Sequence, residues 1–498
     1  MSQVYLGIDI GTQSVKTLFY DADKGRVVAI TSYPLNMISR QDGAREQLAQ
    51  WWIEALRNCL SQVSSDIRQC VAGISVSGQQ HGFVALGTNG DVLAPVKLWC
   101  DTSTIAECEK ITDNFGGPER CISEVGNPIL TGYTAPKILW LKNNKPNAYQ
   151  KLETILLPHD YINLYLTGER VMECGDASGT GLLDVRHRCW HTGMIMAVDQ
   201  DRDLALCLPP LVDSNSAIGK LRAEVAAELG LPAGIRVASG GGDNMMAAIG
   251  TGSVCPGKVS VSLGTSGTIF GYSDKPIVDP HGDLAAFCSS TGGWLPLLCT
   301  MNCTVSTELT RGILGLNIQE MEQKIQASKP GANGVVTLPF YNGERTPNLP
   351  AAKASIFGLD TENYSAENLL RSAMESAVFG LRMGLDVLRR NGFKINSIRL
   401  TGGGSASKSW RQMTADIFNM PVSVQKVDEG AALGAALQAM WVDQKYKGSG
   451  LTIAELVNQH LEQDVASDCI PLAENVAEYR NYYQRYLTHL DVVTPVYS

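Results

Sequence analysis

The sequence predicts an α/β fold that is duplicated, in two halves of about 250 residues that we place at residues 1–250 and 251–498. Two stretches carry this prediction, GIDIGTQSVKTLFY at residues 7–20 and VSLGTSGTIFGY at residues 261–272, because each has the pattern of a strand, a Gly-Thr turn and a second strand. Helical and strand patterns alternate between them, as in an α/β protein. Such an architecture leaves a cleft between its halves, where both turns can face one ligand.

Size and composition favour a protein that binds small molecules. The 498 residues are 44% hydrophobic and 18% charged, with a formal net charge of −9. This acidic balance, without a compensating basic run, argues against nucleic acid or an anionic membrane as the main partner. We expect a cytoplasmic protein, because the amino terminus enters a strand pattern without a leader and no apolar run is long enough to span a membrane. The thirteen scattered cysteines indicate reduced thiols.

The first Gly-Thr turn, Asp9-Ile10-Gly11-Thr12, lies between two strand patterns with alternating apolar residues. Backbone amides and the Thr12 hydroxyl of such a turn can bind phosphate, and Asp9 can hold a hydrated magnesium ion. An ordinary glycine-containing hairpin would have the same pattern, so both interpretations stay open at this point.

The middle of the chain holds SGGGDNMMAA at residues 239–248, after a short strand pattern and before a helical one. Asp243 is therefore expected at a strand-to-helix turn, where glycines let a ligand approach the backbone. A carboxylate there can accept a proton from a bound substrate. It can equally be a helix cap without any catalytic role.

The turn SGQQHG at residues 77–82 offers amide and imidazole groups that suit a polyhydroxylated ligand. Trp99 and Asp101 follow in VKLWCDTST. The tryptophan could offer an aromatic face to a sugar or belong to the core. The aspartate could bind sugar hydroxyls or cap a helix. The loops within residues 150–230 have no function that their chemistry identifies.

In the second half, the loop FYNGERTPNLP at residues 340–350 contains Glu344 and Arg345, which could support the cleft or pair at the surface. A long amphipathic helix is expected over residues 367–391, followed by a strand and the glycines 402–404 at a helix amino end, which suits a nucleotide. The last glycine of a dinucleotide fingerprint is missing there. Residues 428–440, DEGAALGAALQAM, predict a helix whose small residues permit close packing.

Taken together, these stretches resemble the FGGY family of carbohydrate kinases, within the actin, hexokinase and heat-shock ATPase superfamily. The resemblance covers nearly the whole chain through five ordered motifs: GIDIGTQSVK, SGQQHG, GGGDN, SLGTSGT and TGGGSASKSWRQMTAD. It implies a two-domain actin-like (ribonuclease H-like) ATPase fold with duplicated βββαβαβα cores and an interdomain cleft. SGQQHG, TAPKILW, LPHDYINLYLTGE and GERTP are most similar to the members that act on xylulose, rather than on glycerol.

The family's functional positions carry over onto matching residues of this chain. The resemblance implies that Asp243 is the general base and that Asp9 is the acidic residue at the phosphate and its magnesium ion. The expected sugar contacts are Gln80, His81, Trp99, Asp243 and Asn244. The expected ATP contacts are Thr12, Gly264, Thr265, Gly402 and Gly403.

The implied activity is the ATP- and Mg²⁺-dependent phosphorylation of the 5-hydroxyl of D-xylulose. Two loops depart from many bacterial members: Gln80 stands where those have methionine, and WCDTS where they have Trp-Asn-Asp-Gly-Arg. Both forms resemble another branch that includes animal enzymes, and they leave the sugar open among ketopentoses and polyols such as ribulose and ribitol. From a different class, an actin-like or chaperone-like ATPase would share the nucleotide turns but has no need of SGQQHG. The sequence also leaves open whether the chain forms a homodimer.

Overall fold

A computed structural model describes residues 3–427 and 429–497, which divide into two compact units. Unit 1 contains residues 3–255, 272–296 and 429–461, and unit 2 contains residues 256–271, 297–427 and 462–497. The units are therefore not contiguous in sequence. The division into residues 1–250 and 251–498 remains a prediction about the two halves of the chain.

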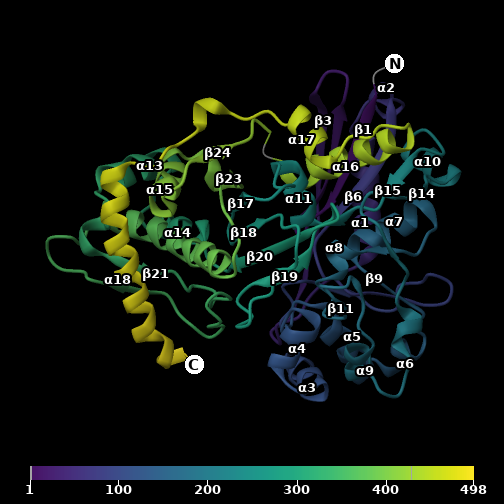
Figure 1. Cartoon of the computed structure of the whole chain (residues 1–498), viewed down its shortest axis with the longest axis horizontal. Coiled ribbons are helices and arrows are strands. Elements are labelled where there is room, and N and C mark those ends of the chain that lie inside the picture. Colours follow the sequence, from purple (N-terminus) through teal and green to yellow (C-terminus); the bar gives the residue numbers. More distant parts are fainter. Residues whose placement is uncertain (1–2, 428, 498) are drawn as a thin grey trace. The chain divides into compact units, whose positions relative to one another are not determined.

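Unit 1 is built on a mixed sheet with the strand order β14-β15-β6-β1-β2-β3, and β16 pairs with β6 at its end (Figure 1). The strands of this sheet are β1 (Val4–Ile10), β2 (Ser14–Asp21), β3 (Arg26–Pro34), β6 (Val71–Gly78), β14 (Ala217–Lys220), β15 (Arg236–Ala238) and β16 (Gly241–Gly242). Shorter strands of the unit are β4 (Ile38–Ser39), β5 (Arg45–Gln47), β7 (Val84–Leu86), β8 (Val96–Lys97), β9 (Thr154–Leu156), β10 (Met172–Glu173), β11 (Leu183–Asp184), β12 (Cys189–Trp190), β13 (Leu211–Val212) and β19 (Ala285–Cys288).

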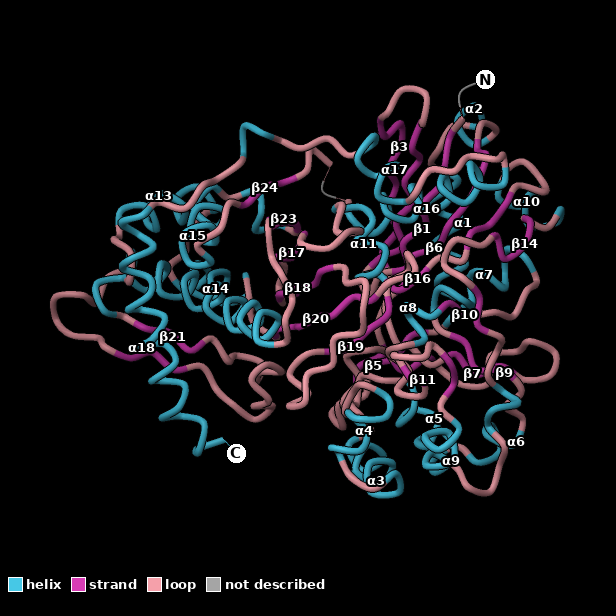
Figure 2. The backbone as a smooth tube through the Cα atoms, in the orientation of Figure 1, coloured by secondary structure: helices cyan, strands magenta, loops and turns pink. Residues whose placement is uncertain are grey.

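Helices connect and cover these strands (Figure 2). They are α1 (Ala49–Ser61), α2 (Ser65–Arg68), α3 (Ile105–Phe115), α4 (Pro118–Val125), α5 (Thr134–Asn144), α6 (Pro146–Gln150), α7 (Pro158–Thr167), α8 (Cys174–Ala177), α9 (Thr192–Val198), α10 (Ala223–Leu229), α11 (Asp243–Thr251), α16 (Gly430–Tyr446) and α17 (Ile453–His460).

Unit 2 contains strands in the order β20-β18-β17-β23-β24, and the same unit holds the long helices α14 and α18. Its strands are β17 (Lys258–Leu263), β18 (Gly267–Gly271), β20 (Trp294–Thr300, of which the residues from Leu297 belong to this unit), β21 (Val336–Leu338), β22 (Ser355–Phe357), β23 (Ser397–Thr401) and β24 (Val422–Val424). Its helices are α12 (Thr304–Ile313), α13 (Ile318–Ala327), α14 (Ala366–Arg390), α15 (Lys408–Phe418) and α18 (Ala473–Tyr497).

The predicted duplication is confirmed by strand pairing. In unit 1, β1 pairs with β2 in antiparallel and with β6 in parallel fashion, and β3 and β15 extend the sheet on either side. In unit 2, β17 pairs with β18 in antiparallel and with β23 in parallel fashion, and β20 and β24 occupy the corresponding outer places. Both Gly-Thr turns therefore connect the first two strands of equivalent sheets.

The two faces of strand β1 meet different helices, because alternate side chains point to opposite sides of a sheet. Leu6 and Ile8 belong to the apolar core that the sheet forms with α1, α7 and α10. Tyr5 lies on the other face, where its hydroxyl donates to Asp443 of helix α16 over 2.9 Å. Asp9 has the same parity as Tyr5, so β1 presents it on the face covered by α16.

Helix α16 approaches both β1 and α11 closely enough to leave no space for side chains. A Cβ atom on Gly7 would lie 1.9 Å from the Ala432 carbonyl oxygen, and one on Gly434 would lie 1.8 Å from the Met246 carbonyl oxygen. Gly250 stands equally close to Gly430. The predicted small-residue helix is confirmed, and its glycines fix the position of α11.

The structure also bears on the cysteines and on the length of the apolar segments. All thirteen cysteines are free thiols. Within residues 3–427 and 429–497, no helix combines the length and the apolar character that a bilayer crossing requires.

Replacing Gly434 with alanine should destabilise the protein by at least about 2 kcal/mol, because the added methyl group overlaps backbone atoms that cannot move without shifting α11. The urea unfolding midpoint measures this loss. Gly312 is the matched control, since it lies in helix α12 and a Cβ there meets nothing within 4 Å. Gly312→Ala should leave stability unchanged or raise it by up to about 1 kcal/mol. Equal effects of both substitutions would contradict the packing argument.

Candidate active site

The carboxyl ends of the parallel strands β1, β6 and β16 gather polar residues at one edge of the unit 1 sheet. Asp9 on β1 pairs in register with Ser77 on β6, and Gly242 on β16 pairs with Gly78. Helix α11 then begins at Asp243. Ligands of open α/β sheets bind at such an edge.

Close approach requires glycine at two of the three positions before Asp243. A Cβ atom on Gly240 would lie 2.3 Å from the Val76 carbonyl oxygen, and Gly240 has a φ of +73°. One on Gly241 would lie 2.3 Å from Ser290 Oγ. The chain therefore reaches Asp243 by running tightly against β6, and larger residues would displace the carboxylate.

Asp243 lies half-buried among other acidic groups. Its Oδ1 atom accepts hydrogen bonds from the Asn244 backbone (2.7 Å) and side-chain amide (3.1 Å). Burial, together with the negative charges of Asp9 and Asp176, raises the pKa of Asp243 to about 8. With such a pKa the ligand-free carboxyl group is largely protonated at neutral pH, and its ionised form is a stronger proton acceptor than an ordinary carboxylate.

Asp9 is the second acidic residue of this edge. Its Oδ1 atom accepts a hydrogen bond from Ser77 Oγ over 2.7 Å. Burial raises its pKa to about 6, although that hydrogen bond and the charge of Lys16 oppose the shift. Lys16 is itself paired with Glu429 at 2.7 Å.

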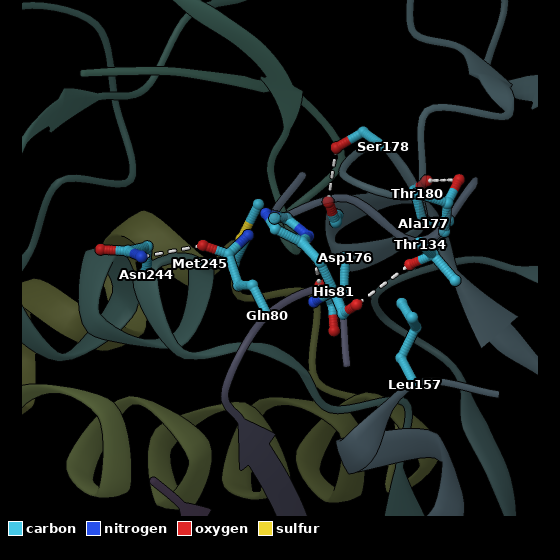
Figure 3. Close-up of polar contacts among 12 residues, drawn as sticks. Gln80, His81, Thr134, Leu157, Asp176, Ala177, Ser178, Thr180, Asn244 and Met245 are labelled. Atoms are coloured by element: carbon cyan, nitrogen blue, oxygen red, sulfur yellow. Dashed lines mark hydrogen bonds and ion pairs between the residues drawn. The ribbon is translucent and has the colours of Figure 1, made fainter. Parts of the chain in front are cut away.

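The turn after β6 brings the candidate sugar contacts to Asp243. The Asn244 side chain donates to Gln80 Oε1 over 2.8 Å, and Gln80 Nε2 lies 3.2 Å from Met245 Sδ (Figure 3). His81 follows, buried with 6% of its surface exposed. Gln80, Asp243 and Asn244 thus form one hydrogen-bonded cluster, and His81 is the next residue along the turn.

Trp99 is connected to the turn after β6 through the first Gly-Thr turn. Its indole nitrogen donates to Thr12 Oγ1 over 3.0 Å, and Thr12 Oγ1 donates to Gln79 Oε1 over 3.0 Å. A hydroxyl has a single proton, so Thr12 would exchange its Gln79 bond if it donated to a phosphate. The half-buried indole is held at the turn and does not belong to the core.

The second Gly-Thr turn lies in unit 2, at the carboxyl end of β17. The Gly264 carbonyl accepts hydrogen bonds from the Thr304 backbone and hydroxyl, both at 2.9 Å, and the Thr265 carbonyl accepts one from Cys303 N at 2.9 Å. These bonds fix the turn against the start of α12. The side chain of Thr265 is exposed.

The glycine triplet of residues 402–404 lies beside this turn. Gly402 has a φ of +81°, and a Cβ atom on it would lie 3.0 Å from the Leu263 carbonyl. A Cβ on Gly403 would meet nothing within 4 Å. The triplet leads into a 3-10 turn at Gly403–Ala406, and α15 starts only at Lys408, capped by Ser407. The glycines were expected at the amino end of a helix. They begin the 3-10 turn, whereas the α-helix begins four residues after the last of them.

A protein-only metal cage is not part of this site: among the described residues, no three His, Cys, Asp or Glu side chains gather as a metal-binding group. Magnesium in kinases needs no such group, because it retains waters and binds one or two carboxylates together with phosphate oxygens.

The chain matches two adjoining family models: the N-terminal domain of the FGGY family of carbohydrate kinases over residues 4–250 and the C-terminal domain of that family over residues 259–442. The chain belongs to the FGGY family of carbohydrate kinases. It is therefore a sugar kinase, an activity that implies ATP as the phosphoryl donor.

Individual members of the FGGY family match nearly the full length. The chain is 42% identical to a xylulose kinase of Haemophilus influenzae, covering 98% of this chain and 99% of the relative. It is 35% identical to a xylulose kinase of Escherichia coli over 87% and 89% of the two chains. A solved structure described as a xyloylose kinase from Brucella ovis superposes with a TM-score of 0.91 at 30% identity, over 99% of this chain and 100% of the other.

The structure describes the surroundings of Asp101 and Glu344, for which the sequence left alternatives open. Asp101 is fully buried and accepts hydrogen bonds from Arg45 N, Lys97 Nζ and Ser103, so it anchors loops. Glu344 does not form a surface pair with the Arg345 side chain. It is buried and accepts hydrogen bonds from backbone N–H groups, including that of Met301 at 2.6 Å.

Sequence reasoning missed several buried partners of this FGGY site. Ser77 and Gln79 belong to the recognised turn, yet their bonds to Asp9 and Thr12 follow only from the register of β1 and β6. Asp176, which faces His81, lies in a stretch to which no role was assigned. The available signal was the concentration of polar residues in otherwise apolar segments.

Asp243→Asn should stabilise the ligand-free protein at pH 8. The native pKa near 8 lies above the ordinary value of 3.8, so the stability that this proton contributes is complete below pH 4 and is lost as the pH rises through 8. Asparagine cannot lose a proton. One pKa unit corresponds to about 1.4 kcal/mol, and we expect a gain of at least about 1 kcal/mol at pH 8 that shrinks towards pH 4.

Urea unfolding at several pH values measures this gain. Asp199→Asn is the control of opposite sign, because burial is outweighed there by the Lys142 and Tyr149 bonds, which lower the pKa of Asp199. That variant should lose stability at pH 8. A destabilised Asp243→Asn protein at pH 8 would contradict the electrostatic description.

Proposed function

We propose that the protein transfers the γ-phosphoryl group of ATP to the 5-hydroxyl of D-xylulose, giving D-xylulose 5-phosphate and ADP. The observation that carries the proposal is the position of the Asp243 carboxylate at the start of α11, where Asn244 links it by hydrogen bonds to Gln80, in the turn that also carries His81. The names of the full-length relatives supply the substrate class.

Asp243 acts as the general base in this proposal. The carboxylate accepts the proton of the sugar hydroxyl while the hydroxyl oxygen forms a bond to the γ-phosphorus, and the bond from that phosphorus to the β,γ-bridging oxygen breaks to release ADP. The raised pKa supports this role, since a base acts best when its pKa is near the operating pH. A typical contribution is about 10²–10⁴ in rate.

Asp9 fits a magnesium ion held jointly with the nucleotide. Burial and the negative charge of Glu429 raise the pKa of Asp9, and burial and the negative charge of Asp9 raise the pKa of Asp243. A divalent cation at Asp9 would relieve this repulsion. Oxygen ligands are the donors that Mg²⁺ prefers. When bound, the ion supplies charge neutralisation at the phosphates, which the chain cannot supply with a Walker-type lysine.

The nucleotide contacts are proposed on both units. In unit 1, the Thr12 turn would bind phosphate oxygens. In unit 2, the adjoining turns at Gly264-Thr265 and Gly402-Gly403 would bind phosphate and adenosine, since glycine and an exposed hydroxyl allow a ligand to reach the backbone.

The nearest alternative is the same transfer to ribulose or ribitol, because the cluster around Asp243 would accept other polyhydroxylated ligands. An ATPase without a small substrate is the alternative from a different class. The buried pair Gln80 and His81 favours a sugar kinase, since such an ATPase has no need of polar groups at this turn.

A coupled ADP-release assay with magnesium ATP tests the proposal across D-xylulose, D- and L-ribulose, ribitol and glycerol. D-xylulose should give the highest kcat/KM, and phosphorus NMR should find the phosphate on the terminal hydroxyl. A higher kcat/KM with ribulose or ribitol would reassign the substrate. Failure of every compound to raise ADP release above the basal rate would contradict a kinase for these sugars.

A further inference from the structure

The backbone at His81 adopts a conformation that its own residue type disfavours. Its φ is +62°, in the left-handed region that non-glycine residues adopt uncommonly. The imidazole packs between Tyr133 and Phe287, with ring centroids at 5.2 and 5.3 Å. It also covers Gly179, where a Cβ atom would lie 1.7 Å from the imidazole Cε1. A conformation of this kind persists only where neighbouring groups hold it.

Helix α5 holds the carbonyl side of His81. The Lys137 Nζ atom donates to the His81 carbonyl over 2.8 Å and to the Gly132 carbonyl over 2.6 Å. Thr134 Oγ1 donates to the same His81 carbonyl over 3.2 Å (Figure 3). Lys137 has no exposed surface, and burial lowers its pKa to about 7. Burying an amine costs free energy unless hydrogen bonds compensate for the lost water. Both of these Lys137 bonds go to backbone carbonyls, so the amine fixes the positions of these carbonyls.

Helix α8 holds the other side of His81. Asp176 Oδ1 accepts the His81 backbone N–H over 3.4 Å and lies 3.6 Å from the imidazole Nδ1 (Figure 3). The Glu173 carboxylate accepts the backbone N–H groups of Gly175 and Asp176, each at 2.6 Å, and so fixes the single turn that carries Asp176.

A buried chain of charges stands behind Asp176. Its Oδ2 atom pairs with His159 Nδ1 at 3.0 Å, and His159 Nε2 lies 2.9 Å from Asp160 Oδ1. Burial opposes both shifts, yet the pairing raises the pKa of His159 and lowers that of Asp176. Replacing such buried ion pairs with apolar residues is often neutral or stabilising, so stability alone explains them poorly.

We propose that Asp176, Lys137 and Thr134 are positioning residues that clamp His81 for recognition of the sugar. This inference rests on the proposed function, in which His81 contacts the sugar. It gives a common role to three separate sequence segments, at residues 134–137, 159–160 and 173–179, which converge on one turn. The clamp acts through His81, so its loss should weaken sugar recognition and leave ATP recognition intact.

The test compares Asp176→Asn with wild type in the ADP-release assay. The KM for D-xylulose should rise about tenfold or more, since a small displacement of a binding group is costly, whereas the KM for ATP should stay within about twofold. Thr134→Val is a milder variant of the same clamp and should raise the sugar KM by about two- to fivefold. Asp199→Asn is the matched control, because Asp199 is also buried and ion-paired in unit 1 but bonds to Lys142 and Tyr149.

A second readout does not depend on turnover. In protein labelled with ¹⁵N-histidine, the imidazole signals of His81, assigned with a His81→Asn variant, should shift in Asp176→Asn and stay fixed in Asp199→Asn. An unshifted His81 signal, or equal effects on sugar and ATP KM in both clamp variants, would overturn the clamp. If no sugar of the panel is phosphorylated, the proposed function fails, and a His81 shift then supports only the positioning of His81 by Asp176.

Discussion

The contact of helix α16 with β1 and α11 is the constraint on which the candidate site depends. Gly7, Gly250 and Gly434 let backbones meet directly, with carbonyl oxygens where side chains would otherwise lie. The start of α11 is thereby held beside the carboxyl end of β6, and Asp243 is held near Asp9. Interiors packed at this density transmit small displacements, so a single methyl group far from the ligand would move the proposed base.

This placement concentrates negative charge in a confined space. Burial raises the pKa of Asp9 and Asp243, and the negative charges of Asp9 and Asp176 raise that of Asp243 further. The ligand-free protein therefore sacrifices stability at the site, as enzymes commonly do where charged groups prepare for chemistry. Asp176 escapes the upward shift because His159 and His81 compensate its charge. One cluster of acids thus separates into a proposed base, a proposed metal-side carboxylate and a proposed clamp.

Local sequence patterns were sufficient for the elements that local chemistry determines. Both Gly-Thr hairpins, the helix start at Asp243 and the small-residue helix α16 were predicted, because glycine positions and apolar alternation specify them. The family resemblance then supplied roles. The discontinuous units, the Trp99–Thr12 bond and the clamp on His81 depend on contacts between distant segments, which periodicity does not encode. Asp101 illustrates the limit, since a cap-like aspartate in a loop proved to be a buried anchor.

The most direct test of the account is a comparison of turnover and sugar binding in Asp243→Asn. The substitution keeps the shape of the side chain and removes only its ability to accept a proton. The account predicts that the rate of phosphoryl transfer to D-xylulose, measured under single-turnover conditions with magnesium ATP, falls by about 10²–10⁴, while the calorimetric Kd for D-xylulose changes by less than about fivefold. Near-normal transfer by this variant would contradict the role of Asp243 as the base.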